Sequence, residues 1–250
     1  MTGLVITGGA LYEYYRLIRI SGSHPQLVSG LVAGLLVYII STLVASGIFS
    51  GKYFLILIPV AAVIMFIELY RKLEKPFDSL AHTFFAIIYI ALPFSLLPFA
   101  AFSREGIGSL LPHGQIVFSP GIVIGFLLLL WANDTGAYLI GVAFGKNRIM
   151  ERISPKKSWE GFIGGAVIAA LAAWLISRWL GVVGTPGWII IALIISVTGT
   201  FGDLVESMLK RSLGVKDSGT IMPGHGGFLD RFDSAIVAFP FVYLFISLFG

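Results

Sequence analysis

Long apolar runs separated by short polar segments constrain the fold of this 250-residue chain more than any other feature. A helix needs about 20 mostly apolar residues to cross the hydrocarbon core of a bilayer, and these runs are continuous, without the period-two alternation typical of membrane β-barrels. The sequence therefore predicts an all-α polytopic membrane protein with about eight transmembrane helices. The expected spans lie at about 3–20, 26–50, 53–70, 79–102, 118–140, 161–180, 185–203 and 234–250.

The amino-acid composition supports a membrane location. Hydrophobic residues make up 57% of the chain and charged residues 12%, whereas soluble domains carry about 25% charged residues. The net charge of +4 fits basic loops beside a membrane and gives no reason to expect nucleic acid as a partner. Because the chain has no cysteine, a disulfide framework, a thiolate zinc site and a cysteine nucleophile are all excluded.

The distribution of lysine and arginine predicts the orientation of the spans. If the first span ends on the cytoplasmic side, all of the 17 lysines and arginines except Lys52, Arg104 and Arg178 fall in cytoplasmic segments. The two longest cytoplasmic loops are then 141–160 and 204–233, and they hold most of the polar residues of chemical interest. We expect an N-terminal transmembrane scaffold over 1–117 and a C-terminal transmembrane domain over 118–250 that carries the chemistry.

Polar residues at the end of the seventh span and just after it share one helical face. Asp203, Ser207 and Lys210 are separated by four and then three positions, which places them on one side of a helix. A carboxylate oxygen suits Mg²⁺, and Lys210 with Arg211 suits phosphate oxygens. The alternative is structural: Glu206 and Lys210 form an i,i+4 surface pair, and Asp203 only ends a helix.

Two further carboxylates, Asp230 and Asp233, precede the last span and share a face if the final helix has already begun. Aspartate is favoured at a helix N-terminus, where it accepts hydrogen bonds from free amides. Alternatively, the pair joins Asp203, and the three carboxylates hold one or two metal ions. The two interpretations are compatible for Asp230. Arg231, between the two, is either a positive-inside anchor or a contact for substrate.

The run Pro223-Gly224-His225-Gly226-Gly227 cannot be helical. Its glycines let backbone amides approach an anion closely. It is not a Walker loop, because no Gly-Lys-Ser/Thr follows. His225 is either a hydrogen-bonded structural residue or a proton relay.

Asn133 and Asp134 interrupt the otherwise apolar fifth span. A carboxylate inside a membrane segment is by default a functional-site hypothesis; the alternative is that Asp134 pairs with a lysine or with backbone amides. The neighbouring glycines at 136, 141 and 145 indicate either close helix packing or a broken helix.

Basic residues follow at Lys156 and Lys157, next to Ser158. Such residues beside a membrane often bind anionic lipid headgroups or fix the topology. Two lysines between two serines, with proline before and glycine after, are more specific than a simple basic run, and they would suit a triphosphate.

Taken together, these motifs resemble the signature of the phosphatidate cytidylyltransferases, also called CDP-diacylglycerol synthases. The resemblance is specific over about 130–235 and elsewhere rests on hydropathy alone. The positions that match in the C-terminal motif are Ser207, Lys210, Arg211, Lys216, Asp217, Pro223, Gly224, His225, Gly226, Gly227, Asp230, Arg231 and Asp233. The positions that match upstream include Asp134, Tyr138, Gly145, Ser154, Lys157, Ser158, Gly161 and Asp203.

The resemblance implies a dimeric, multi-span protein of a prokaryotic inner membrane that makes CDP-diacylglycerol and pyrophosphate from CTP and phosphatidic acid. It also implies a polar cavity that faces the cytoplasm and holds the active site. It implies Mg²⁺, with K⁺ as a second cation, at Asp203, Asp230 and Asp233. These three residues, Lys210 and His225 are the expected catalytic set. The expected substrate contacts are Asp134, Lys156, Lys157, Ser158, Ser207, Arg211, Lys216, Gly224, Gly226, Gly227 and Arg231.

Members of the family usually begin with an additional span and a basic N-terminus, whereas the start of this chain is apolar and is expected to lie outside. The resemblance therefore predicts a shortened or alternatively started form of the family's chain. Two other functions fit some of the same residues. A CTP-dependent lipid kinase of the polyprenol type would release CDP instead of pyrophosphate, and an ion- or proton-coupled transporter would also use intramembrane acids and glycines.

Overall fold

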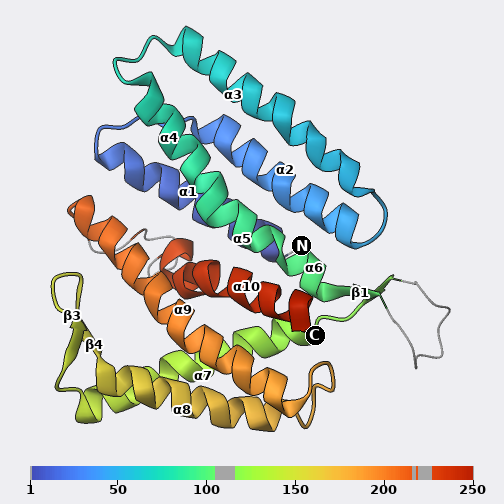
Figure 1. The fold of residues 1–250 in the computed structure, drawn as a ribbon. Coiled ribbons are helices and arrows are strands. Elements are labelled where there is room, and N and C mark those ends of the chain that lie inside the picture. Colours follow the sequence, from blue (N-terminus) through green and yellow to red (C-terminus); the bar gives the residue numbers. More distant parts are fainter. Residues whose placement is uncertain (1, 105–115, 216–217, 219–226, 250) are drawn as a thin grey trace. The chain divides into compact units, whose positions relative to one another are not determined.

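The structure is a computed structural model that describes residues 2–104, 116–215, 218 and 227–249. Over these residues the chain is mostly helical, as predicted (Figure 1). It forms two compact units, which are described separately below: residues 1–118 with 213–231, and residues 119–212 with 232–250. The proposed division into a scaffold at 1–117 and a catalytic domain at 118–250 stays a prediction.

The first unit contains a series of helices followed by one short antiparallel hairpin, in which Phe102 faces Phe118. Its elements are α1 (Thr2–Ile20), α2 (Leu27–Ala45), the 3-10 helix η1 (Gly51–Ile56), α3 (Leu57–Arg71), α4 (Pro76–Ala86), the π-helix η2 (Ile87–Ala91), α5 (Leu92–Ser95), α6 (Leu97–Ala101), β1 (Phe102–Arg104) and β2 (Ile116–Phe118). The N-terminal part of α10 also belongs to this unit.

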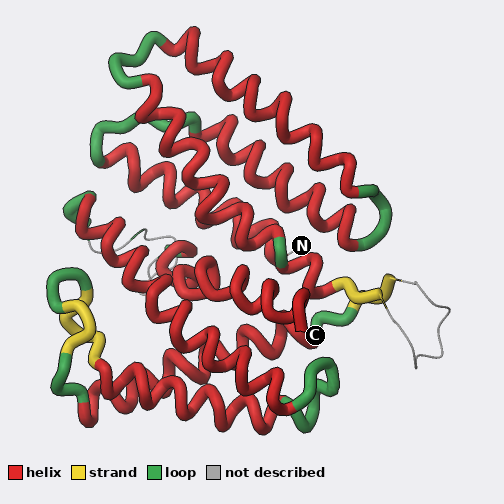
Figure 2. Tube along the Cα trace, in the orientation of Figure 1, coloured by secondary structure: helices red, strands yellow, loops and turns green. Residues whose placement is uncertain are grey.

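The second unit is built from long helices and a second short hairpin, which lies in the predicted loop 141–160 (Figure 2). Its elements are α7 (Gly121–Phe144), β3 (Arg148–Met150), β4 (Ser154–Ser158), α8 (Trp159–Ile176), α9 (Thr185–Ser212) and most of α10 (Phe228–Phe249).

Seven helical segments of the described residues are long and apolar enough to cross a membrane, which makes this a multi-pass membrane protein. They are Leu27–Ala45, Gly51–Arg71, Pro76–Ala101, Gly121–Phe144, Trp159–Ile176, Thr185–Ser212 and Phe228–Phe249. The prediction of about eight spans agrees with this approximately. The difference lies at α1, which does form a helix but carries Glu13, Arg16 and Arg19.

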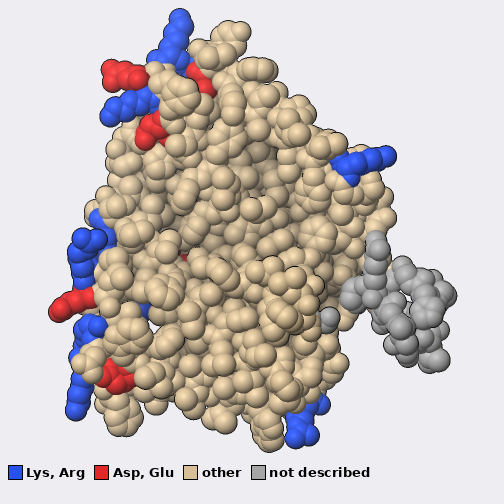
Figure 3. Space-filling model, in the orientation of Figure 1, with Lys and Arg blue, Asp and Glu red and all other residues tan. Residues whose placement is uncertain are grey.

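The surface of these helices is largely uncharged. Lys, Arg, Asp and Glu occupy little of the face drawn in the space-filling view (Figure 3). Large apolar side chains are exposed instead, among them Leu69 at 75% and Val142 at 73%. Such side chains suit a lipid environment, because the hydrocarbon core offers no water for polar groups.

Three helices bear on the chemistry. Helix α7 continues through Asn133 and Asp134, so the broken helix that was one of the two interpretations of the glycines nearby is not present. Helix α9 extends to Ser212 rather than ending near residue 203, and α10 begins at Phe228 rather than near residue 234. Asp203, Ser207 and Lys210 therefore lie on one helix, as their spacing indicated, and Asp230 and Asp233 lie on another.

Glycines allow α7 and α8 to approach each other closely. A Cβ atom at Gly165 would lie 2.8 Å from the backbone oxygen of Asn133, and one at Gly136 would lie 2.8 Å from Ile168 Cβ. Small residues at helix contacts are a common device in membrane proteins, where close packing takes the place of the hydrophobic effect. Close packing, rather than a broken helix, explains these glycines.

Candidate active site

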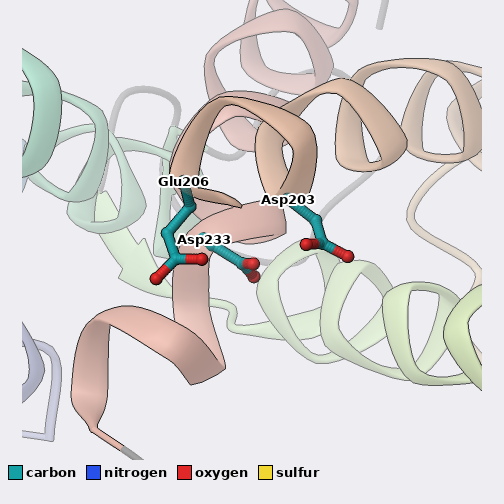
Figure 4. Close-up of side chains that lie close together, drawn as sticks. All are labelled: Asp203, Glu206 and Asp233. Carbon is teal, nitrogen blue, oxygen red and sulfur yellow. The ribbon is translucent and has the colours of Figure 1, made fainter. Parts of the chain in front are cut away.

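Three carboxylates of the second unit converge at the contact between α9 and α10 (Figure 4). Asp203 and Glu206 project from α9 and Asp233 from α10, and one oxygen of each lies within 4.8 Å of the others. The side chain of Glu206 is fully buried, and Asp233 is 8% exposed. The Asp233 Oδ1 atom also accepts a hydrogen bond from the amide of Ser234, at 2.6 Å.

A glycine brings the two helices together at this point. A Cβ atom on Gly202 would lie 2.8 Å from the backbone oxygen of Asp233 and 3.0 Å from Ser234 Cα. These distances are shorter than an ordinary van der Waals contact of about 3.5–4.0 Å between carbon atoms. A side chain at residue 202 would therefore push the backbone that carries Asp233 away from the neighbouring Asp203.

Two lysines form ion pairs with the carboxylate cluster. Lys157, at the end of β4, pairs with Asp203 and donates a 3.4 Å hydrogen bond to the backbone oxygen of Thr200. Lys210 pairs with Glu206 at 2.5 Å. The side chains of both lysines are partly buried, at 25% and 14% exposure.

The charges and donor atoms of this cluster fit a divalent cation. Three carboxylates meet there and two ammonium groups pair with them, while Asp134 lies within electrostatic range of Lys157 and Asp203. Negative charge therefore exceeds positive charge at the cluster. Like charges at such short range are costly unless a cation compensates them, and Mg²⁺ prefers carboxylate oxygens together with substrate phosphates.

Several residues that were predicted from spacing do lie together. Ser207 donates to Asp203 Oδ1 over 3.3 Å, and Lys210 lies one turn further along the same helix. Asp134 Oδ1 accepts a 3.4 Å hydrogen bond from Asn133. The proposed roles of these residues in metal or substrate binding stay predictions.

Glu206 was missed as a member of the cluster. From the sequence, Glu206 was considered only as a partner of Lys210 in a surface ion pair. The pair is present, but the Glu206 side chain is fully buried. The three-residue spacing from Asp203 was the available signal, because residues three apart on a helix are neighbours.

Asp230 forms the helix cap that was considered for it. Its Oδ2 atom accepts hydrogen bonds of 3.0 Å from the amides of Gly227 and Ser218. Because α10 begins at Phe228, Asp230 bonds back to the residue that precedes the helix, as in a capping box. Asp230 belongs to the first unit, and its role as a metal ligand stays a prediction.

The remaining predicted contacts are exposed, capped or outside the described residues. Ser158 is the N-cap of α8, where its Oγ atom accepts a 3.2 Å hydrogen bond from the amide of Gly161. Lys156, Arg211 and Arg231 are exposed. The predicted positions that lie outside the described residues are Lys216, Gly224, His225 and Gly226.

Comparison of the sequence with known proteins points to one family. The family model described as "Cytidylyltransferase family" matches residues 1–249. Curated proteins named phosphatidate cytidylyltransferase are also similar: one from Bacillus subtilis is 47% identical over 125 residues, and one from Haemophilus influenzae is 43% identical over 129 residues. These alignments cover 49% and 50% of this chain and 46% and 45% of the relatives.

A phosphatidate cytidylyltransferase from Brucella suis is 37% identical over 158 residues, which cover 63% of this chain and 58% of the relative. The chain thus spans about half the length of the curated relatives it matches. Since the family model extends over nearly the whole sequence, the chain belongs to the cytidylyltransferase family.

Proposed function

We propose that this protein is a phosphatidate cytidylyltransferase, which converts CTP and phosphatidic acid into CDP-diacylglycerol and pyrophosphate. The observation that carries the proposal is the carboxylate cluster of Asp203, Glu206 and Asp233, the last two of them buried, with its two paired lysines, in a multi-pass member of the cytidylyltransferase family. The names of the similar curated proteins support the choice of substrates.

The proposed reaction needs no covalent intermediate with the protein. A phosphate oxygen of phosphatidic acid attacks the α-phosphorus of CTP, and a new P–O bond forms. The bond from the α-phosphorus to the oxygen that bridges to the β-phosphate breaks, and pyrophosphate leaves with that electron pair. Because the dianionic phosphate is already a nucleophile, the main obstacle is bringing two polyanions together.

Basic residues of the second unit are suited to overcome this repulsion. Lys157 and Lys210 already lie at the carboxylate cluster, and we assign them to the triphosphate together with Lys156, Ser158 and Arg211. Preorganised cations of this kind act by positioning the reactants and by compensating charge in the transition state.

The carboxylates are assigned to metal binding. Asp203 and Asp233, with Glu206 beside them, would hold Mg²⁺, and we propose Asp230 as a further ligand and K⁺ as a second cation. When bound, the metal would neutralise phosphate charge and align the triphosphate. We also propose that Asp134 completes the polar site, that His225 relays a proton, and that Lys216, Arg231 and the amides of Gly224 and Gly226 bind substrate phosphate. The amide of Gly227, which was also expected to bind substrate, donates to Asp230 instead.

The setting of the enzyme completes the proposal. The lysine and arginine distribution supports an active site that faces the cytoplasm. The bacterial origin of the similar proteins supports a prokaryotic inner membrane, and we propose a homodimer in contact with membrane lipids.

The test follows the label of α-³²P-CTP during incubation of the detergent-purified protein with phosphatidic acid and Mg²⁺. We expect the label to enter the lipid phase while unlabelled pyrophosphate is released. A label that stays in the water phase as CDP, with phosphorylated lipid appearing, would contradict the proposal and favour a lipid kinase. A folded protein that gives no turnover under any of these conditions would also contradict it.

A further inference from the structure

Helix α1 supplies a buried carboxylate to the start of α10, within the first unit. Glu13 is 1% exposed, and its Oε2 atom accepts a 2.8 Å hydrogen bond from the amide of Leu229. The same oxygen lies 3.4 Å from Ser218 Oγ, which donates to it. Glu13 was part of the segment that the sequence assigned to a scaffold.

The position of Leu229 explains what this contact does. The first amides of a helix have no partner inside the helix, and the side chain of the preceding residue commonly accepts from the second or third of them. Here the preceding residue is Gly227, which has no side chain, and Leu229 is the second residue of α10. The acceptor that a serine or an aspartate would normally provide at residue 227 comes instead from Glu13.

The space around Gly227 is consistent with Glu13 providing the cap in place of a side chain at residue 227. A Cβ atom at this position would overlap the Glu13 carboxylate and would lie 2.5 Å from Ser218 Oγ. A further glycine of α1, Gly9, makes room for the first residue of α10, because a Cβ on it would lie 2.6 Å from the Phe228 ring. Helix α1 is thus shaped to receive the start of α10.

We propose that Glu13 is a positioning residue for the transfer reaction, which caps α10 from another helix and thereby fixes Asp230. Two acidic side chains share the cap: Asp230 binds the amides of Gly227 and Ser218, and Glu13 binds the amide of Leu229. Both carboxylates also favour the positive end of the helix dipole. The kinetic part of this inference rests on the proposed function, whereas the capping part does not.

The first test replaces Glu13 by alanine in the full-length protein and measures both structure and rate. Leu229 then keeps a buried amide without its acceptor, so hydrogen exchange in peptides covering 227–231 should accelerate by about 5- to 150-fold. We expect kcat per folded molecule to fall by about 10-fold or more, because small displacements of aligned groups are expensive. Glu13→Gln keeps one acceptor oxygen and should recover most of both losses.

A control comes from a second buried glutamate of the same unit. Glu68 is 4% exposed and is bound by Gln26 and Arg71 at 2.6 Å and 2.9 Å, far along the chain from α10. Glu68→Gln should lower thermal stability while leaving kcat and the exchange of 227–231 within about twofold of wild type. Equal kcat losses in Glu13→Ala and Glu68→Gln would reduce Glu13 to a general stabilising residue and overturn the proposal.

A reciprocal rescue separates capping from packing. Gly227→Ser alone should impair the protein, because its Cβ meets the Glu13 carboxylate. In the double variant Glu13→Ala with Gly227→Ser, the serine occupies the vacated space and caps the helix locally, so exchange and kcat should both improve over Glu13→Ala. A double variant no better than its parents would overturn the cap. If the wild type lacks cytidylyl transfer, the proposed function fails, and the exchange measurements still decide the role of Glu13.

Discussion

Replacing Gly202 by alanine should separate α9 from α10 where Asp203 and Asp233 face each other. The added Cβ would lie 2.8 Å from the backbone oxygen of Asp233. A backbone atom cannot rotate away as a flexible side chain can, so one helix must shift. Gly199 offers a matched control, because it lies one turn earlier on the same helix and its Cβ would make only ordinary contacts, 3.5 Å from Leu130 Cδ1 and 3.6 Å from Ser234 Cβ.

The comparison isolates the cost of the clash. Both substitutions gain about 0.5–1 kcal/mol, because alanine is a better helix former than glycine. Only Gly202→Ala has the overpacking cost of about 1–3 kcal/mol. The gain in helix propensity is the same in both variants and cancels in the comparison. The two variants should therefore differ in unfolding free energy by about 1–3 kcal/mol. For a chain of this size that corresponds to a difference in Tm of about 2–12 °C.

Thermal unfolding in detergent and the radiolabel assay together provide the measurement. We expect Gly199→Ala to match or exceed the wild type in both Tm and activity. Gly202→Ala should have the lower Tm and a turnover reduced by about 10-fold or more, since the carboxylates no longer align. Equal Tm and equal activity for the two variants would refute the close contact at Asp233 and the importance of its alignment.

Three further predictions concern the charges of the same cluster. Asp203→Asn should abolish turnover while the protein elutes and unfolds like the wild type, and near-normal activity would remove this residue from the metal site. Glu206→Gln should cost about 3–5 kcal/mol of stability by removing the buried carboxylate that pairs with Lys210, and adding Lys210→Met should restore part of the lost Tm; a double variant less stable than Glu206→Gln would contradict this. Removal of divalent cations by EDTA should stop turnover and lower the Tm, and Mg²⁺ should restore both; activity that persists in EDTA would argue against a metal at the cluster.

The sequence was most informative where physical constraints act locally. Membrane-length apolar runs specify helices because the bilayer leaves few alternatives, and seven of the about eight expected spans are helices long and apolar enough to cross a membrane. Helical spacing alone predicted that Asp203, Ser207 and Lys210 share one face of a helix. The 3.3 Å hydrogen bond from Ser207 to Asp203 confirms that these two side chains are in contact.

Features that depend on contacts distant along the chain were not predictable in the same way. Whether the glycines beside Asp134 indicate close packing or a broken helix is decided by α8, which packs closely against them. The burial of Glu206 depends on α10 lying beside α9, which no local pattern reveals. The link from Glu13 to Leu229 joins residues 216 positions apart, and a single glutamate in an apolar helix carries no signal of its partner.

That separation has a consequence for how the protein is made. Chains are synthesised at about 5–20 residues per second, so Glu13 exists for roughly 10–40 s before the amide of Leu229 is polymerised. During this interval a carboxylate destined for the interior must be tolerated by the insertion machinery or by the lipid headgroups. Contacts between such distant residues also form late, because closing a long loop costs entropy before any bond is gained. The start of α10 is thus expected to acquire its native contacts late. A nascent chain that has not yet reached Leu229 carries Glu13 without the amide that it binds in the folded protein.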